Sequence, residues 1–209
     1  RLAYALALSD LILAPATPSN TARVGGVIMP ITTSLAKAFG SEPQNGPRKI
    51  GSFLMQSIYQ VNTITSAMFQ TSMAGNTLVA ALALQSFGIG ITWGDWAMAA
   101  IVPGIIALII MPYFIYKVYP PEIKDAREAQ QMIREELKGL GKMSFQEWVM
   151  LGVFILALVL WATSQFTKLD ATTVAFLGIS ILLATGVLIW DDVKSEKGAW
   201  DTLVWMGTL

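Results

Sequence analysis

The chain of 209 residues contains no cysteine and no histidine, and only 13% of its residues are charged. A soluble domain carries about 25% charged residues. The missing residue types exclude disulfides, thiol nucleophiles, imidazole acid–base catalysis and zinc sites built from cysteine and histidine. The formal net charge is zero, so nothing favours nucleic acid as a partner. We therefore expect a protein that is not an enzyme and does not bind nucleic acid.

The sequence contains long segments without a charged residue. Hydrophobic residues make up 54% of the chain, and the mean hydropathy is +0.56. Trp96–Tyr116, Trp148–Thr167 and Ala171–Trp190 are uncharged, and each has the length of about 20 residues that one membrane crossing requires. Aromatic residues lie at the ends of these runs, as they do at membrane interfaces. The sequence predicts an all-α, multi-pass integral membrane protein.

A fourth uncharged run, residues 50–94, is long enough for two crossings. Basic residues cluster before it, at 37–49, and after the next span, at 117–142, and both clusters are expected on the cytoplasmic side. An even number of crossings must separate them, and residues 96–116 supply one. The run is therefore predicted to be one interrupted crossing, with the break at Gly75-Asn76, rather than two crossings joined by a turn.

The first 38 residues have the pattern of a re-entrant hairpin. Apolar arms at 2–16 and 24–36 flank a polar segment, Pro18–Arg23. Each arm has about 15 residues or fewer, roughly 22 Å as a helix, against about 30 Å of hydrocarbon. Non-helical backbone at membrane depth is tolerated only where it is buried in protein or lines a cavity. We expect the hairpin to enter from the cytoplasmic side and its tip to bind a ligand.

Ser19, Asn20 and Thr21 at this tip can donate hydrogen bonds without adding charge, which suits an anion. Ser19 or Asn20 can also cap the second arm. The N-terminus of a half-helix in the membrane attracts carboxylates through its dipole and free N–H groups. The alternative is simple capping of a tight turn, with no ligand.

Gly75, Asn76 and Thr77 form the second candidate group. Glycine lets the backbone unwind, asparagine supplies a donor and an acceptor, and unwound carbonyls can coordinate Na⁺. A kinked helix with a packed glycine is the alternative. In the hairpin, Asp10 and Arg23 are the ionisable residues at depth, where charge is costly and usually functional. Arg23 could contact a bound carboxylate or pair with Asp10.

The organisation predicted from these features has five parts. A charged, amphipathic stretch at 120–146 is expected to be a cytoplasmic interfacial helix, with a regulatory or partner-binding role as the alternative. We also expect the chain to be a piece of a larger transporter. The parts are a hairpin (1–38), a loop and interrupted transmembrane helix (39–94), a transmembrane helix (95–119), the interfacial helix (120–146) and the first spans of a second repeat (147–209).

Three segments carry a family resemblance. They are APATPSNTARVGG at 14–26, AGNTLVAALA at 74–83 and YKVYPPEI at 116–123. They resemble the divalent anion:sodium symporter family, in its branch of dicarboxylate and tricarboxylate antiporters. That branch includes citrate/succinate and tartrate/succinate antiporters and the plastid 2-oxoglutarate/malate translocators. The resemblance runs along essentially all 209 residues.

The resemblance implies a fold of two inverted repeats, each with a re-entrant hairpin and a broken helix. It implies a homodimer in a membrane, with an elevator-like movement of the transport domain and a second Ser-Asn-Thr hairpin after residue 209. The lipid bilayer expected is a bacterial inner (plasma) membrane. The substrate ligands implied are Ser19, Asn20, Thr21, Gly75, Asn76 and Thr77. Arg23 is a further candidate ligand because it lies two residues after Thr21. Ser19, Asn20 and Gly75 are also expected to hold Na⁺ if transport is sodium-coupled.

The break also bears on the coupling mechanism. Sodium-coupled members of the family usually carry a Gly-Ser/Thr-Pro-Pro-Asn-like sequence there, whereas this chain has Met-Ala-Gly-Asn-Thr at 73–77. The predicted function is therefore exchange of one di- or tricarboxylate for another, with no cofactor. The alternatives are a Na⁺-coupled dicarboxylate symporter and, less favoured, an anion channel, for which no ring of like charges is evident.

Overall fold

The computed structural model describes residues 1–17, 19–123 and 141–206, and the described residues form helices without a β-strand. They divide into two units, Arg1–Gly141 and Lys142–Leu209. Most of the predicted interfacial helix at 120–146 lies outside the described residues. An all-α protein is what the uncharged runs predicted.

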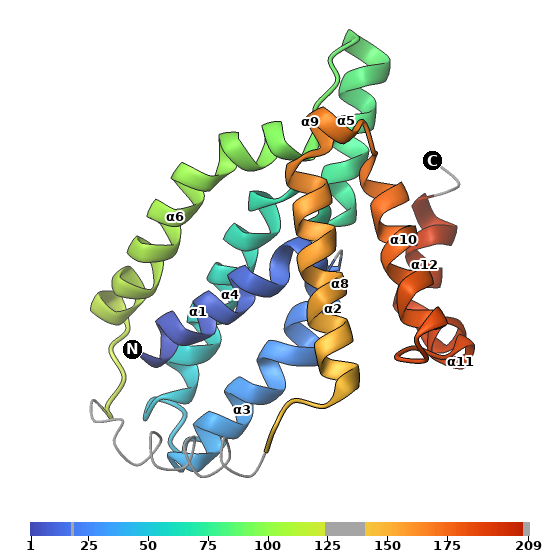
Figure 1. Ribbon diagram of the computed structural model, residues 1–209. Coiled ribbons are helices and arrows are strands. Elements are labelled where there is room, and N and C mark those ends of the chain that lie inside the picture. The colour runs from blue at the N-terminus through green and yellow to red at the C-terminus, as the bar shows by residue number, and fades with distance from the viewer. Residues whose placement is uncertain (18, 124–140, 207–209) are drawn as a thin grey trace. The chain divides into compact units, whose positions relative to one another are not determined.

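The first unit begins with a helical hairpin (Figure 1). Helix α1 (Leu2–Leu13) continues as a 3₁₀ turn, η1 (Ala14–Ala16), and the chain then reverses. The second arm is a continuous helical run that contains a π-helical segment, and it consists of α2 (Asn20–Arg23), η2 (Val24–Ile28) and α3 (Met29–Ala38). The arms match the predicted hairpin in position, and its re-entrant placement in a membrane stays a prediction.

The fourth uncharged run is one interrupted helix. Helix α4 (Gly51–Met68) ends at a break, and α5 (Ala74–Phe87) continues onward instead of folding back beside α4 (Figure 1). The break itself is Phe69–Met73, with the 3₁₀ turn η3 (Gln70–Ser72) between two extended residues. The break predicted at Gly75-Asn76 was therefore misplaced by a few residues, because Gly75, Asn76 and Thr77 form the first turn of α5.

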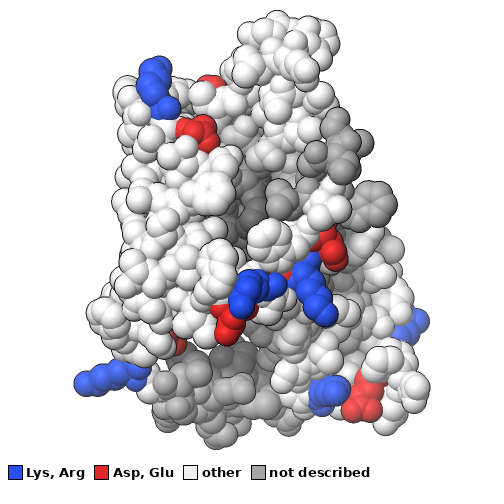
Figure 2. Space-filling model, turned by 90° about the vertical axis from the view of Figure 1, so that its right-hand side faces the viewer, with Lys and Arg blue, Asp and Glu red and all other residues white. Residues whose placement is uncertain are grey.

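Helix α6 (Trp93–Val118) follows a short turn that begins at Gly88, where φ is +68°. It is long and apolar enough to cross a membrane, as predicted for residues 95–119. Its exposed side chains are largely apolar, including Ile101, Val102 and Ile106. Figure 2 shows that most described atoms on one face of the molecule belong to uncharged residues, as lipid or protein contact inside a bilayer requires.

Helix α4 is the centre of the first unit, because α1, α3 and α6 all pack against it. Buried side chains recur along α4 every three or four residues and contact apolar residues of its three neighbours. The main buried cluster is Ala3, Leu6, Ile28, Phe39, Ile50, Phe53, Leu54, Ile58 and Ile115. This cluster holds the hairpin against α4, and a second cluster of Ala7, Val61, Met68 and Leu108 packs against Phe69 at the break.

Gly104 of α6 packs directly against the side chain of Met68 at the end of α4. A Cβ at this position would lie 2.5 Å from Cγ and 2.6 Å from Sδ of Met68, which is 2% exposed. We expect Gly104→Ala to destabilise the protein by about 1–3 kcal/mol, since overpacking forces a buried neighbour off its rotamer. Thermal unfolding in detergent measures this change. Gly152→Ala, where a Cβ meets nothing within 4 Å, is the matched control.

The second unit contains α8 (Phe145–Ala162), α9 (Ser164–Thr167), α10 (Ala171–Ala184), α11 (Trp190–Ser195) and α12 (Lys197–Met206). Helix α8 is long and apolar enough to span a membrane. The run at 171–190 was predicted as one crossing, but α10 has only 14 residues. It ends because Gly186 takes φ +70° and its N–H returns to the Leu183 carbonyl.

Asp170 caps the start of α10. Its carboxylate accepts hydrogen bonds from the backbone N–H groups of Thr172 and Thr173 and from the Thr173 hydroxyl. The hydrogen bond from the Thr173 side chain, followed by that from the Thr173 N–H, lowers the pKa of Asp170 below its ordinary value. The local cap is strongest when this carboxylate is ionised.

Candidate anion-binding site

Two helices begin at the predicted site residues, α2 at the hairpin tip and α5 after the break. The second arm of the hairpin begins after extended Ser19 (φ −118°, ψ 109°), whose Oγ accepts a hydrogen bond of 3.2 Å from the Ala22 N–H. The predicted capping role of Ser19 is thereby confirmed. Helix α5 begins after extended Met73, which makes no side-chain cap. Among the described residues, the N–H groups of Ala74 and Gly75 thus have neither a side-chain cap nor an intrahelical acceptor.

Arg23 joins the hairpin tip to the break. Its Nη1 donates to the carbonyl of Thr17 at the tip (3.1 Å) and to the carbonyl of Ser72 in the break (3.3 Å). Its Nη2 donates to the hydroxyls of Thr65 (3.3 Å) and Ser66 (3.2 Å), near the end of α4. One guanidinium therefore contacts the tip, the break and the helix before it.

The fifth N–H of Arg23, on Nε, donates to Asp10 Oδ1 at 2.9 Å. The second oxygen of Asp10 accepts a hydrogen bond from the Thr65 hydroxyl. Arg23 is 0% exposed and Asp10 is 1% exposed. A buried ion pair is tolerated when both partners are fully hydrogen-bonded, and this one is.

This geometry favours one of the two roles expected for Arg23. A guanidinium has five N–H donors, and all five are bonded to protein groups. Direct contact with substrate would break one of these bonds. These contacts favour the structural pair with Asp10 over direct contact between Arg23 and a substrate carboxylate.

Asn76 also has a structural task. Its Nδ2 donates to the carbonyls of Ser66 (2.7 Å) and Phe69 (2.9 Å), which lie at the end of α4. The hydroxyl of Ser72 donates toward the same two carbonyls, at 2.7 Å each. Asn76 is 5% exposed. The break is thus closed by side chains that satisfy the free carbonyls of α4, which explains why it precedes Gly75.

The remaining predicted ligands are more accessible. Ser19, Thr21 and Thr77 are exposed and Asn20 is half-buried. Asn20 Oδ1 accepts from the Thr21 N–H at 2.9 Å, and its Nδ2 has no partner among the described residues. The Thr77 hydroxyl donates to the Ala74 carbonyl at 2.7 Å. The site can therefore offer neutral donors from the tip and N–H groups from the start of α5.

Sequence reasoning missed several residues that build this site. Thr65, Ser66 and Ser72 hold Arg23 or close the break, and they are 0–4% exposed. Their signal was present as a concentration of hydroxyl residues at 63–72 in a run with no charge. The partner of each hydroxyl was not visible, because the partners come from other segments.

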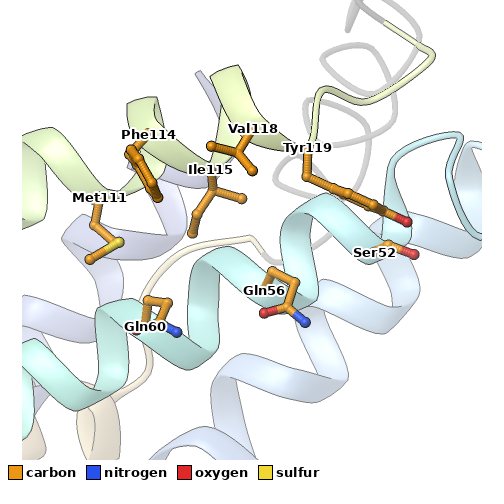
Figure 3. Close-up of a pocket in the computed structure, with 8 residues that line it drawn as sticks. All are labelled: Ser52, Gln56, Gln60, Met111, Phe114, Ile115, Val118 and Tyr119. Atoms are coloured by element: carbon orange, nitrogen blue, oxygen red, sulfur yellow. The ribbon is translucent and has the colours of Figure 1, made fainter.

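A cavity of about 570 Å³ lies elsewhere, between α4 and α6. Figure 3 shows Gln56 and Gln60 of α4 facing it, with Phe114 and Met111 on the α6 side. It is lined by none of the predicted ligands. The predicted ligands lie instead at the hairpin tip and in the first turn of α5.

Comparison with known proteins supports the family assignment. The family model described as the sodium:sulfate symporter transmembrane region matches residues 1–209. The chain belongs to this family. Together with the long apolar helices, this makes it part of an integral membrane protein, and the resemblance seen in the sequence is confirmed.

Curated relatives are similar over the whole chain. The putative malate transporter YflS of Bacillus subtilis is 54% identical over 100% of the chain and 44% of its own length. The inner membrane protein YbhI of Escherichia coli is 47% identical over 99% of the chain and 43% of its length. Dicarboxylate transporter 1, chloroplastic, of Spinacia oleracea is 44% identical over 100% of the chain and 37% of its length. The chain thus spans about two-fifths of the length of these relatives.

Proposed function

We propose that the protein containing this chain is a secondary transporter of di- or tricarboxylates that exchanges one anion for another by alternating access. The observation that carries the proposal is that Arg23 bonds both the hairpin tip, where α2 begins beside neutral donors, and the break that precedes α5. Helix N-termini bind carboxylates through free N–H groups and the helix dipole. In transporters, broken helices form the substrate site in this way.

The names of the relatives support the substrate class. One is called a putative malate transporter and another a dicarboxylate transporter. Malate carries two carboxylates, and neutral hydrogen-bond donors beside a helix N-terminus suit a carboxylate. Ser19, Asn20, Thr21 and Thr77, with the N–H of Gly75, are the groups we propose as ligands. A second set from the rest of the protein would hold the other carboxylate.

Exchange is favoured over sodium coupling by the partners of the oxygen atoms at the junction. The carbonyls of Thr17 and Ser72 accept from Arg23, so a Na⁺ ion there would compete with a guanidinium. Ser19 Oγ and Asn20 Oδ1, the oxygens expected to hold Na⁺, accept from backbone N–H groups. The N–H donors point their positive ends at these oxygens, which weakens each oxygen as a ligand for a cation.

The full-length protein in liposomes tests this proposal. We expect uptake of labelled malate to require an internal dicarboxylate and to be independent of a Na⁺ gradient. Uptake that needs Na⁺ and ignores internal dicarboxylate would establish the symporter alternative. Flux that does not saturate, and is not accelerated by substrate on the far side, would favour a channel. The absence of any di- or tricarboxylate uptake would overturn the proposal.

We propose a bacterial inner membrane as the location and a homodimer as the assembly. The two bacterial relatives are more similar to this chain than the chloroplastic one, at 54% and 47% against 44% identity. The homodimer rests on the family resemblance. Fractionation and the mass of the purified protein in detergent test these two points.

A further inference from the structure

One buried hydroxyl joins three segments beside the site. Thr71 Oγ1 in the break donates to the carbonyl of Pro15, at the end of the first hairpin arm, at 2.5 Å. The same oxygen accepts a hydrogen bond of 3.0 Å from Nε1 of Trp93, the first residue of α6. Thr71 is 9% exposed and Trp93 is 8% exposed. These hydrogen bonds are therefore shielded from water.

Trp93 is itself held in place from two sides. Its ring stacks on Phe69, the first residue of the break, with ring centroids 5.7 Å apart and planes 17° apart. The start of α6 is fixed by a capping box in which Thr92 and Asp95 bond each other's backbone N–H groups. The indole N–H therefore has a defined direction toward the Thr71 hydroxyl.

This contact is a second attachment between hairpin and break, separate from Arg23. Pro15 lies two residues before Thr17, and Thr71 lies next to Ser72; Thr17 and Ser72 are the residues whose carbonyls bind Arg23. A single attachment leaves two segments free to rotate about it, whereas two attachments fix both distance and orientation. The tip and the start of α5 are thus set relative to one another by Arg23 and Thr71 together.

We propose that Thr71, oriented by Trp93, is a positioning residue that sets the spacing between the hairpin tip and the N-terminus of α5, and thereby the affinity for substrate. This inference rests on the proposed function, because the spacing matters only if one carboxylate group of the substrate contacts both the hairpin tip and the N-terminus of α5. Binding groups must be held within about 0.5 Å of their productive geometry. Neither residue contacts the anion itself.

The test measures exchange kinetics of the full-length protein in liposomes. Thr71→Val keeps the shape of the side chain but removes both hydrogen bonds. We expect the KM for malate to rise about five- to tenfold, as for the loss of a buried hydrogen bond, with the maximal rate per folded protein retained. Thr71→Ser, which keeps the hydroxyl, is expected to restore the wild-type KM.

Trp93→Phe supplies an independent variant, because it keeps the ring stack but removes the indole N–H. It is expected to raise KM less than Thr71→Val, since the bond from Thr71 to Pro15 remains. In the Thr71→Val background it should add nothing, because both substitutions act through the same hydroxyl. Trp96→Phe is the matched control, since the Trp96 N–H bonds the Ala67 carbonyl of α4 (2.9 Å) and not the hairpin.

The outcomes are separable. If the wild-type protein exchanges malate and Thr71→Val has an unchanged KM, or loses only maximal rate through less folded protein, positioning by Thr71 is overturned. If Thr71→Val does not fold, an unchanged KM in Trp93→Phe overturns it equally. A wild-type protein that transports no di- or tricarboxylate overturns the proposed function, and this inference with it.

Discussion

Asn20→Asp is expected to abolish malate exchange while leaving the protein folded. The new carboxylate can still accept the hydrogen bond that Asn20 Oδ1 receives from the Thr21 N–H, so the tip keeps its conformation. It also places a negative charge where a substrate carboxylate is proposed to bind, and it removes the free Nδ2 donor. Two carboxylates in contact repel each other strongly where water is excluded.

The milder substitution Asn20→Ala gives a graded result. It removes the amide donors without adding charge, and hydrogen bonds to a charged group are worth about 1.5–3 kcal/mol, so exchange should fall about 10- to 100-fold. Gln85→Glu makes the same amide-to-carboxylate change as Asn20→Asp at an exposed position of α5, so it is the control and should have little effect on exchange. Thermal unfolding in detergent verifies that the Asn20→Asp and Asn20→Ala proteins are folded. Near-normal transport by Asn20→Asp would remove the tip from the site.

Arg23→Ala is expected to cause the largest loss of stability of any single substitution near the site. It leaves the carboxylate of Asp10 buried without its counter-charge, and breaking a buried pair in this way costs about 3–5 kcal/mol. It also leaves the carbonyls of Thr17 and Ser72 without their donor. We expect a lower unfolding temperature in detergent, with or without malate.

A double substitution distinguishes structure from binding. Asp10→Asn combined with Arg23→Gln removes both charges and keeps polar groups at both positions, so it should recover part of the lost stability. Arg23→Lys is expected to have an unfolding temperature between those of Arg23→Ala and the wild type. Lysine keeps the positive charge, but its ammonium group cannot donate to five acceptors in a planar arrangement. If Arg23→Ala unfolds at the wild-type temperature but no longer responds to malate, then Arg23 is a substrate ligand and our assignment is wrong.

The hairpin and the interrupted helix could be predicted from local features of the sequence. The short apolar arms around Pro18–Arg23 are visible in neighbouring residues, and the positions of the lysine and arginine clusters at 37–49 and 117–142 set the number of crossings between them. The break was placed at Gly75-Asn76 because glycine and asparagine favour irregular backbone. The structure puts it at Phe69–Met73, since Asn76 and Ser72 reach back to the carbonyls of α4 and start α5 after Met73.

The length of an uncharged run also overestimated the length of one helix. The run at 171–190 has no charge and the length of a crossing, yet α10 stops at Ala184. The left-handed conformation of Gly186 ends the helix, and hydropathy carries no information about it.

The sequence by itself determined that this chain is a helical membrane protein of a known transporter family, with a neutral, hydroxyl-rich tip between two short arms. These properties follow from charge, length and residue type, which are local. Only the tertiary structure showed that the guanidinium of Arg23 is fully hydrogen-bonded to protein groups and is not a free cation. Its partners in α4 and the break lie 42–49 residues away in the sequence, and only packing around α4 brings them to one guanidinium.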